Sequence, residues 1–251
     1  MKKDNLVIFG FQRSATKLVA SILEQGGYFS HGEFFDVYSC ELIGETAIRL
    51  PFPLQQSNSK ILREYDSLMI EYYRTAEARK RMDIFRTMHR HPKSVVTVFS
   101  EEMCSLFDLY QLLSDRYFLC TRRANKLEQV LSLLVTKTHR NFNDEFKSTP
   151  ITVNIPALSR YLSILYKTEL FQDSIVESGN GEILDFDSII SGAVDFGFPY
   201  TIQTSDQHDD IKSLITNIDE VQRAYDALTL RYQFGRDVKT ADFSKYIAPI
   251  V

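Results

Sequence analysis

Cysteine is scarce in this sequence of 251 residues, and the three that occur are Cys40, Cys104 and Cys120. They are odd in number and widely spaced, and none forms a CxxC pair or a metal-type cluster with histidine. This pattern argues against a disulfide framework. It favours reduced, mostly buried thiols in a reducing compartment, and we therefore expect a cytoplasmic protein.

Long hydrophobic runs are also missing. No stretch approaches the roughly 18 apolar residues that a transmembrane helix needs, so stable membrane insertion is not expected. The N-terminal sequence MKKDNLVIFGF places lysines before an apolar stretch. That stretch is only about half as long as the apolar region of a signal peptide can be, so we expect no targeting segment.

A strong net charge is absent as well. The chain carries 29 basic and 33 acidic side chains, for a formal net charge of −4. This balance disfavours bulk binding of nucleic acid, although a local basic pocket for a small anion remains compatible with it. The apolar content of 44% and the charged content of 25% are ordinary for a globular protein, and the length suits a single domain over residues 1–251.

Strand and helix patterns alternate along the chain. Four short apolar runs predict buried parallel strands, at residues 6–9, 94–100, 116–123 and 181–186. Amphipathic segments predict helices, at residues 14–25, 125–142, 157–178 and 209–232. Strands that alternate with helices predict an α/β, three-layer fold with a mostly parallel central sheet. Residues 34–91 are expected to add a large helical insertion, and residues 205–251 a C-terminal helical segment.

The most informative stretch is GFQRSATKLVASILEQGG, from Gly10 to Gly27. It places a polar turn between an apolar strand and a helix, where free backbone N–H groups and the positive end of the helix dipole meet. Hydroxyl donors and positive charge are added by Ser14, Thr16, Arg13 and Lys17. The stretch predicts a loop that binds phosphate or sulfate. Taken alone, it also fits an ordinary strand-to-helix turn with a cap.

The loop departs from the GxxxxGK[ST] pattern of nucleoside-triphosphate sites. Counted from Gly10, the second glycine position is Ala15, the lysine position is Thr16, and the hydroxyl position that would bind magnesium is Lys17. The order of Thr16 and Lys17 is the reverse of the pattern, which disfavours the usual magnesium–nucleotide site. The backbone groups of the loop could still bind a phosphate. At Ala15, a negative φ would be unstrained and a positive φ strained.

The strand–GxxRSxT–helix pattern resembles the 5′-phosphosulfate loop of sulfotransferases that use 3′-phosphoadenosine 5′-phosphosulfate (PAPS). The usual form of that loop is [PQ][KR]SGT, and residues 12–16 read QRSAT here. The resemblance implies a P-loop-like fold that binds PAPS. It assigns the 5′-phosphosulfate to a group of five residues: Arg13, Ser14, Ala15, Thr16 and Lys17.

A second segment, TRRANKLEQVLS, resembles the part of the same family that binds the 3′-phosphate. There a strand ends in arginine and the following helix carries a serine, and the R-x-x-K-x-x-Q-x-x-S spacing is most similar to the bacterial glycolipid-sulfotransferase branch. The implied ligands are Arg123 and Ser132, which can converge on one phosphate. Because their spacing is one residue longer than in the commonest animal enzymes, Arg122 stays open as an alternative. Taken alone, the arginines also fit surface charges and the serine a packing role.

The resemblance also implies a general base, because sulfuryl transfer needs removal of the acceptor's proton and positive charge on the departing oxygens. In the bacterial glycolipid and tyrosyl-protein branches, the base is a glutamate shortly after the first helix. The matching residue here is Glu33, in the sequence HGEFF, with Arg13 as the stabilising cation. The alternatives are a helix-start carboxylate at Glu33 and a competing base at His31. The Lys-Thr-His segment of the animal branch is missing, since residues 97–102 read TVFSEE.

The implied reaction moves the sulfuryl group of PAPS to a hydroxyl-bearing acceptor and leaves 3′-phosphoadenosine 5′-phosphate (PAP). The acceptor would be a small molecule, a saccharide or a lipid, and residues 34–91 would form much of its side of the site. No metal is required, because a sulfuryl group carries less charge than a phosphoryl group. The alternatives are a P-loop phosphotransferase (kinase) that uses ATP and magnesium, and a catalytically degenerate nucleotide-binding or interaction module.

Two weaker patterns complete the sequence. The stretch GEILDFDSIIS is a faint third match to the family, in which Asp185 and Asp187 are predicted to act as helix caps. Residues 89–91 read HRH, and without a cysteine or carboxylate at useful spacing they predict an exposed basic turn rather than a metal site.

Overall fold

The computed structural model describes residues 4–33, 93–99, 113–139, 149–202 and 211–237. Its strands are β1 (Asn5–Gly10), β2 (Phe29–Ser30), β3 (Ser94–Phe99), β4 (Tyr117–Arg122) and β5 (Gly181–Asp185). Its helices are α1 (Thr16–Gln25), α6 (Lys126–His139), α7 (Ile155–Glu177), α8 (Phe186–Ile190), the 3₁₀ helix η2 (Ile211–Leu214) and α9 (Ile218–Asp237).

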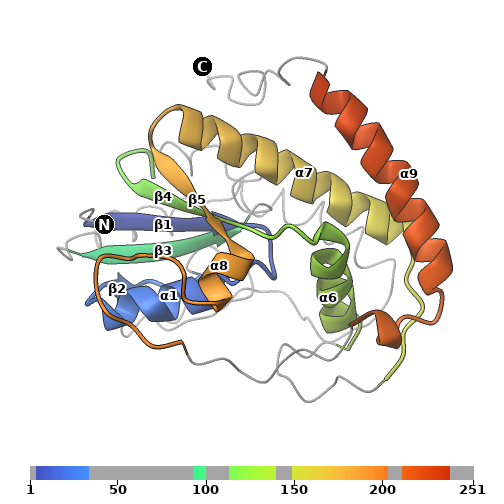
Figure 1. Ribbon diagram of the computed structural model, residues 1–251, viewed down its shortest axis with the longest axis horizontal. Helices are drawn as coiled ribbons and strands as arrows, with labels where there is room; N and C mark the ends of the chain where they lie inside the picture. Colours follow the sequence, from blue (N-terminus) through green and yellow to red (C-terminus); the bar gives the residue numbers. More distant parts are fainter. Residues whose placement is uncertain (1–3, 34–92, 100–112, 140–148, 203–210, 238–251) are drawn as a thin grey trace, which may run out of the picture.

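The five strands form one sheet in the order β2-β3-β1-β4-β5, and every neighbouring pair is parallel (Figure 1). β1 lies in the middle, with Gly10 opposite Phe99 of β3 and opposite Thr121 of β4. Its residues from Leu6 to Gly10 are all buried, which explains the continuous apolar run.

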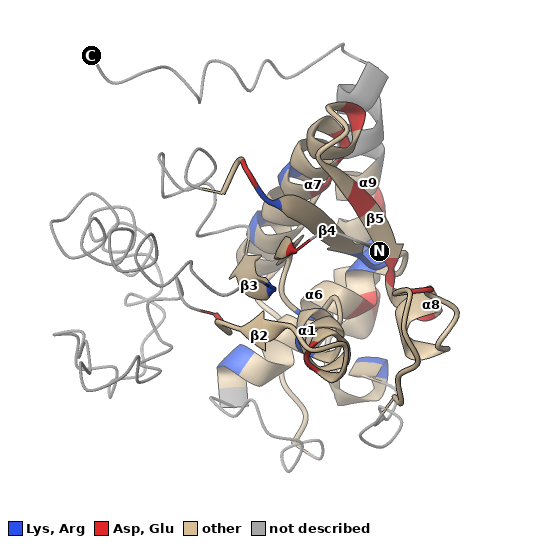
Figure 2. Cartoon of the chain, turned by 90° about the vertical axis from the view of Figure 1, so that its left-hand side faces the viewer, with Lys and Arg blue, Asp and Glu red and all other residues tan. Residues whose placement is uncertain are grey.

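Helices cover both faces of the sheet, which gives three layers (Figure 2). On one face, α1 and α8 pack against Leu6 and Ile8 of β1. On the other face, Phe9 of β1 meets Phe171 of α7 at a ring-centroid distance of 5.6 Å. The helices α6 and α9 pack on α7 and form a second apolar cluster with it. The predicted α/β fold with a parallel sheet is confirmed.

Most predicted elements lie within a few residues of the observed ones, and three differences remain. The two-residue strand β2 was not predicted, because it is too short to show a period. The helix predicted from residue 209 is split, with η2 and a turn preceding α9. Asp185 caps α8, as predicted, by accepting a hydrogen bond from the Ser188 N–H, whereas Asp187 lies in the first turn of that helix.

Several sequence predictions fall outside the described residues. They include the helical insertion at 34–91, the basic turn at 89–91, the segment at 100–102, and Cys40 and Cys104. Of the predicted C-terminal segment, η2 and α9 are described. No helix in the described ranges combines the length and the apolarity that a membrane span requires.

The strand order places a switch in chain direction at the centre of the sheet. From β1 the chain moves to one side, through α1 to β2 and β3, and it then crosses to β4 and β5 on the other side. Ligands of open parallel sheets bind at the carboxyl ends of the strands at such a switch point. Here the loop after β1 and the turn after β4 meet at that place.

Candidate anion-binding site

The loop between β1 and α1 has an unusual backbone. Arg13 has a φ of 65° and Ala15 a φ of 66°, so both adopt the left-handed region that favours glycine. Ser14 lies between them at negative φ, and such alternation turns successive N–H groups toward one side and makes an anion-binding concavity. Of the two possibilities considered for Ala15, a negative and a positive φ, the structure has the positive and strained one.

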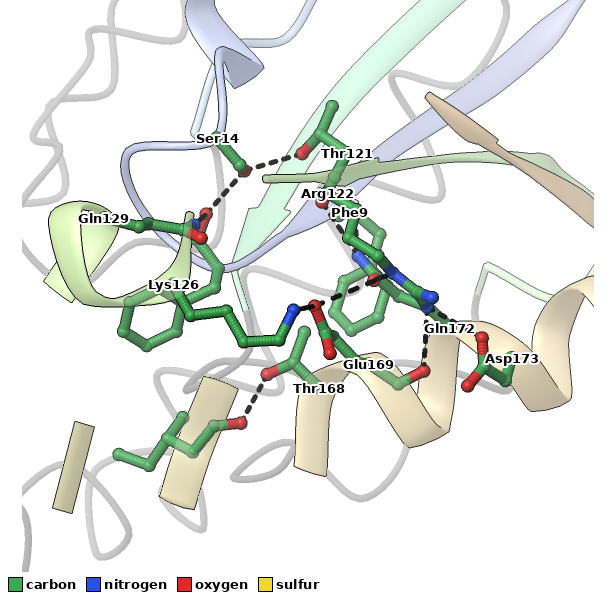
Figure 3. A network of polar contacts seen from close by, with 12 residues as sticks. Phe9, Ser14, Thr121, Arg122, Lys126, Gln129, Thr168, Glu169, Gln172 and Asp173 are labelled. Carbon is green, nitrogen blue, oxygen red and sulfur yellow. Dashed lines mark hydrogen bonds and ion pairs between the residues drawn. The ribbon is translucent and has the colours of Figure 1, made fainter. Parts of the chain in front are cut away.

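Ser14 holds the loop against β4. Its hydroxyl donates to the Phe11 carbonyl at 2.6 Å, and it lies 2.7 Å from the Thr121 hydroxyl (Figure 3). Because one hydroxyl carries one proton, Thr121 is the donor in the second contact. The Ser14 side chain is fully buried, so in this structure it supports the loop from beneath.

Gly10 is required by this close approach. A Cβ at Gly10 would lie 2.2 Å from the Thr121 hydroxyl oxygen and 2.8 Å from that of Ser14. No side chain fits at such distances. The glycine at the end of β1 therefore allows the loop to fold back over the end of β4.

The first turn of α1 presents backbone donors. Its first hydrogen bond to the loop runs from the Val19 N–H to the Ala15 carbonyl at 3.0 Å. Within the described parts of the chain, the N–H groups of Thr16, Lys17 and Leu18 have no acceptor. They lie at the positive end of the helix dipole. The Thr16 side chain is buried and that of Lys17 is exposed.

The helix α6 joins the predicted 3′-phosphate segment to this loop. The Arg13 guanidinium donates from Nε to the Ser132 hydroxyl at 3.0 Å, across 119 residues of sequence. One helical turn earlier, the Gln129 amide donates to the Gln12 carbonyl at 2.9 Å. The residues assigned to the two ends of one nucleotide are thus in direct contact.

The two arginines at the end of β4 point to different partners. Arg122 donates to the Asp173 carboxylate at 2.8 Å and to the Gln172 side-chain oxygen at 3.1 Å, both on α7 (Figure 3). Arg123 instead pairs with Glu128 in the first turn of α6, and its guanidinium lies 4.4 Å from the centroid of the Phe186 ring. Arg123 is therefore the arginine on the side of α6, where Ser132 lies.

Glu33 lies at the same edge of the sheet as the loop. The chain after β2 continues alongside β3, where the Thr97 N–H donates to the Gly32 carbonyl at 2.9 Å. The pairing of β2 with β3 covers Phe29 and Ser30, and Gly32 beyond it has a φ of 59°, so Glu33 lies just past the end of β2 and outside the strand ladder.

His31, the competing base, is placed differently. Its side chain is buried, and its ring meets Phe29 edge to face at 5.0 Å. Glu33 is half-buried and therefore reaches solvent, while His31 does not. Of these two candidates, Glu33 has the more accessible side chain.

Three residues of the site were not singled out from the sequence: Thr121, Glu169 and Gln172. Thr121 had a weak signal, since it is a polar residue near the end of a predicted strand beside two arginines. Glu169 and Gln172 had none, because they lie in α7 and meet the site only through the fold. Lys126, part of the 3′-phosphate motif, pairs with Glu169 at 2.7 Å.

No group of three or more metal-ligating side chains occurs among the residues that the structure describes. Comparison with models of protein families finds none that matches this chain, and comparison with curated proteins finds no matching sequence.

Proposed function

We propose that this protein binds PAPS and transfers its sulfuryl group to a hydroxyl-bearing acceptor. The observation that carries the proposal is the contact between Arg13 and Ser132. The sequence motifs assign these residues to opposite ends of one nucleotide, and they lie far apart in the chain. The fold brings them together at the switch point of a parallel sheet, where a ligand is expected.

In this proposal the loop and α1 hold the 5′-phosphosulfate. The N–H groups at the start of α1 and the Thr16 hydroxyl donate to its oxygens, and Arg13 and Lys17 supply positive charge. The Ser14 hydroxyl fixes the loop, so that Ser14 and Ala15 contribute chiefly through their backbone. Such an alternating backbone is strained, and strain of this kind is concentrated at binding and catalytic sites.

The 3′-phosphate is assigned to Arg123 and Ser132. The Phe186 ring lies against the Arg123 guanidinium and restricts its motion, so less entropy is lost when it binds an anion. Glu128 is the counterion that the phosphate would replace. Arg122 is engaged by α7 and has a supporting role here.

Glu33 is the proposed general base. As the acceptor oxygen forms a bond to sulfur, its proton passes to the Glu33 carboxylate, and the bond between sulfur and the bridging phosphate oxygen breaks. The electron pair of that bond stays on PAP, where Arg13 stabilises the negative charge. Support for this role comes from its position, since Glu33 follows the carboxyl end of β2, at the edge of the parallel sheet where the loop after β1 also begins.

Nucleotide binding tests the proposal. Calorimetry and thermal unfolding with PAP in the presence of EDTA are expected to show micromolar affinity, and a rise in melting temperature by ligand linkage. Stabilisation by magnesium–ATP and not by PAP would overturn the proposal in favour of a phosphotransferase. No stabilisation by either nucleotide would favour an interaction module.

A variant of Glu33 tests the chemistry. Glu33→Gln is expected to lower turnover, measured as PAP release from PAPS with phenolic, saccharide or glycolipid acceptors, by about 10²- to 10⁴-fold. PAP affinity is expected to stay within about twofold, because the side chain meets the acceptor and not the nucleotide. Glu24→Gln, an exposed change of equal charge on α1, is the matched control. A large loss of PAP affinity in Glu33→Gln would contradict the assignment as base.

A further inference from the structure

The side chain of Gln172 connects the ends of β1 and β4. It lies in the C-terminal half of α7 with 1% of its surface exposed. Its amide nitrogen donates to the Phe9 carbonyl and to the Thr121 carbonyl, both at 3.1 Å. Its amide oxygen accepts from Nε of Arg122, also at 3.1 Å (Figure 3). Both N–H groups and the oxygen of this amide are thus used.

The two carbonyls lie where the proposed nucleotide site begins. Phe9 precedes Gly10, at which the anion loop starts, and Thr121 precedes Arg122, the last residue of β4, and Arg123, which follows it. These positions are at the last rungs of the β1–β4 ladder, since Gly10 pairs with Thr121. One amide group therefore holds the starting points of both phosphate-binding segments.

The Gln172 amide is held in place by Arg122, which is itself bound by other residues of α7. Arg122 also donates to the Glu169 carbonyl at 3.0 Å and pairs with Asp173 at 2.8 Å. The Glu169 carboxylate, in turn, accepts from Lys126 at the start of α6, at 2.7 Å. The network joins the end of β4, the start of α6 and one turn of α7.

Packing alone would not require an amide at this place. Phe9 and Phe171 meet close by, and an apolar side chain of the same length would fill the space beside them. Burying an amide costs desolvation free energy. Unlike an apolar side chain, the amide makes hydrogen bonds of defined direction. Its hydrogen bonds set both the spacing and the orientation of two strand ends.

We propose that Gln172 is a positioning residue that sets the relative placement of the 5′- and 3′-phosphate sites of one nucleotide. The inference rests on the proposed function, because it presumes a ligand with two phosphates. A ligand held at two sites binds more tightly than one held at either site only if their spacing matches the ligand. For reacting groups, a misplacement of about 1 Å can lower the rate by up to about 10²-fold, which shows how sensitive such sites are to spacing.

The affinities for three nucleotides distinguish a change in the spacing of the two phosphate sites from a general loss of structure. Adenosine 5′-phosphate and adenosine 3′-phosphate each need one phosphate site, whereas PAP needs both at the correct separation. In Gln172→Met, the affinity for PAP is expected to fall by about tenfold or more, and the affinity for each monophosphate to change by less than about twofold. The affinities are measured by calorimetry without magnesium, on protein whose fold is checked by circular dichroism.

The matched control is Gln222→Met. Gln222 also lies on a helix, α9, where its amide donates to Asp226 at the surface, and its replacement is expected to leave all three affinities unchanged. Gln172→Asn is the second variant, for the case that Gln172→Met does not fold. It keeps the amide but is one methylene shorter, so its nitrogen no longer holds both carbonyls at hydrogen-bond distance, and the same pattern of affinities is expected.

The outcomes distinguish this inference from the proposed function. If the wild-type protein does not bind PAP, the proposed function is overturned and this inference falls with it. If the wild-type protein binds PAP and the variants weaken all three nucleotides equally, or none, only the positioning role of Gln172 is overturned.

Discussion

Ala15 and Arg13 show how single residues shape this site. Each has a positive φ without being glycine, and such a backbone costs on the order of 1–3 kcal/mol per residue. The surrounding contacts hold the conformation in place, above all the buried pair of hydroxyls of Ser14 and Thr121. A backbone of this kind turns successive N–H groups toward one side, as in sites where proteins bind anions.

Ala15→Gly is predicted to stabilise the protein. Glycine adopts positive φ without the Cβ contact, so the free energy of unfolding is expected to rise by about 1 kcal/mol, or about 2–4 °C in melting temperature. PAP affinity is expected to stay the same or increase. Urea denaturation and thermal scans measure the change.

The control for this prediction is Ala20→Gly, in the interior of α1, where glycine is expected to destabilise by about 1 kcal/mol. The two substitutions are identical in chemistry and opposite in expected sign. Equal destabilisation by both would show that the conformation of Ala15 carries no strain.

Glu128 forms an ion pair with Arg123, the proposed ligand of the 3′-phosphate. Its carboxylate neutralises Arg123, and a 3′-phosphate would have to displace it. Glu128→Gln is therefore predicted to raise PAP affinity by roughly two- to fivefold, as expected for a pair that is partly exposed. Adenosine 5′-phosphate, which lacks the 3′-phosphate, is expected to bind unchanged. Weaker PAP binding in Glu128→Gln would mean that the carboxylate aligns Arg123 instead of competing for it.

The helix α7 combines packing with support of the candidate site. It covers one face of the sheet, packs against α6 and α9, and carries the polar network under the site. Its start is specified locally: the Asn154 side chain accepts from the Ala157 N–H at 3.0 Å, and Pro156 occupies the first turn. Both features are typical of helix N-termini.

Asn154→Ala is predicted to lower the free energy of unfolding by about 1 kcal/mol, because the N-terminus of α7 loses its cap. Asn154→Ser keeps a capping oxygen and is expected to be close to wild type. PAP affinity is expected to be unchanged in both, since Gln172 lies several turns away. A loss of PAP affinity in Asn154→Ala would show that the end of α7 is coupled to the site.

At the scale of the whole molecule, two helical layers bury the sheet and its one described cysteine. Cys120 of β4 is completely buried, and this burial raises the pKa of its thiol to about 12. A group whose pKa is raised by folding contributes stability that is complete below its unfolded pKa, near 9, and is lost as the pH rises toward the folded value.

The free energy of unfolding is therefore predicted to fall as the pH rises above about 9. In Cys120→Ala the decline is expected to begin only near pH 10, where tyrosines ionise. Urea denaturation at pH 8, 9, 9.5 and 10 measures both curves. Identical slopes between pH 9 and 10 in the two proteins would contradict the burial of this thiol as its cause.

Much of the architecture could be predicted from local patterns. The four long strands appear as apolar runs because both faces of a parallel sheet are buried, and α1, α6 and α7 appear through their helical periodicity. The Asp185 cap could be predicted because a cap acts within its own turn. β2 could not be predicted, since a two-residue strand depends on its neighbour β3 for its existence.

Some features of the candidate site could likewise be predicted from the sequence, and others could not. The segments that carry hydroxyls and positive charge at strand ends could be predicted from the sequence, because those residues are adjacent in the chain. Three contacts follow from the three-dimensional fold alone: Arg13 with Ser132, Arg122 with α7 while Arg123 stays beside α6, and Gln172 with two strand ends. These contacts connect residues that are far apart in sequence, and they form only when the order and register of the strands bring them together.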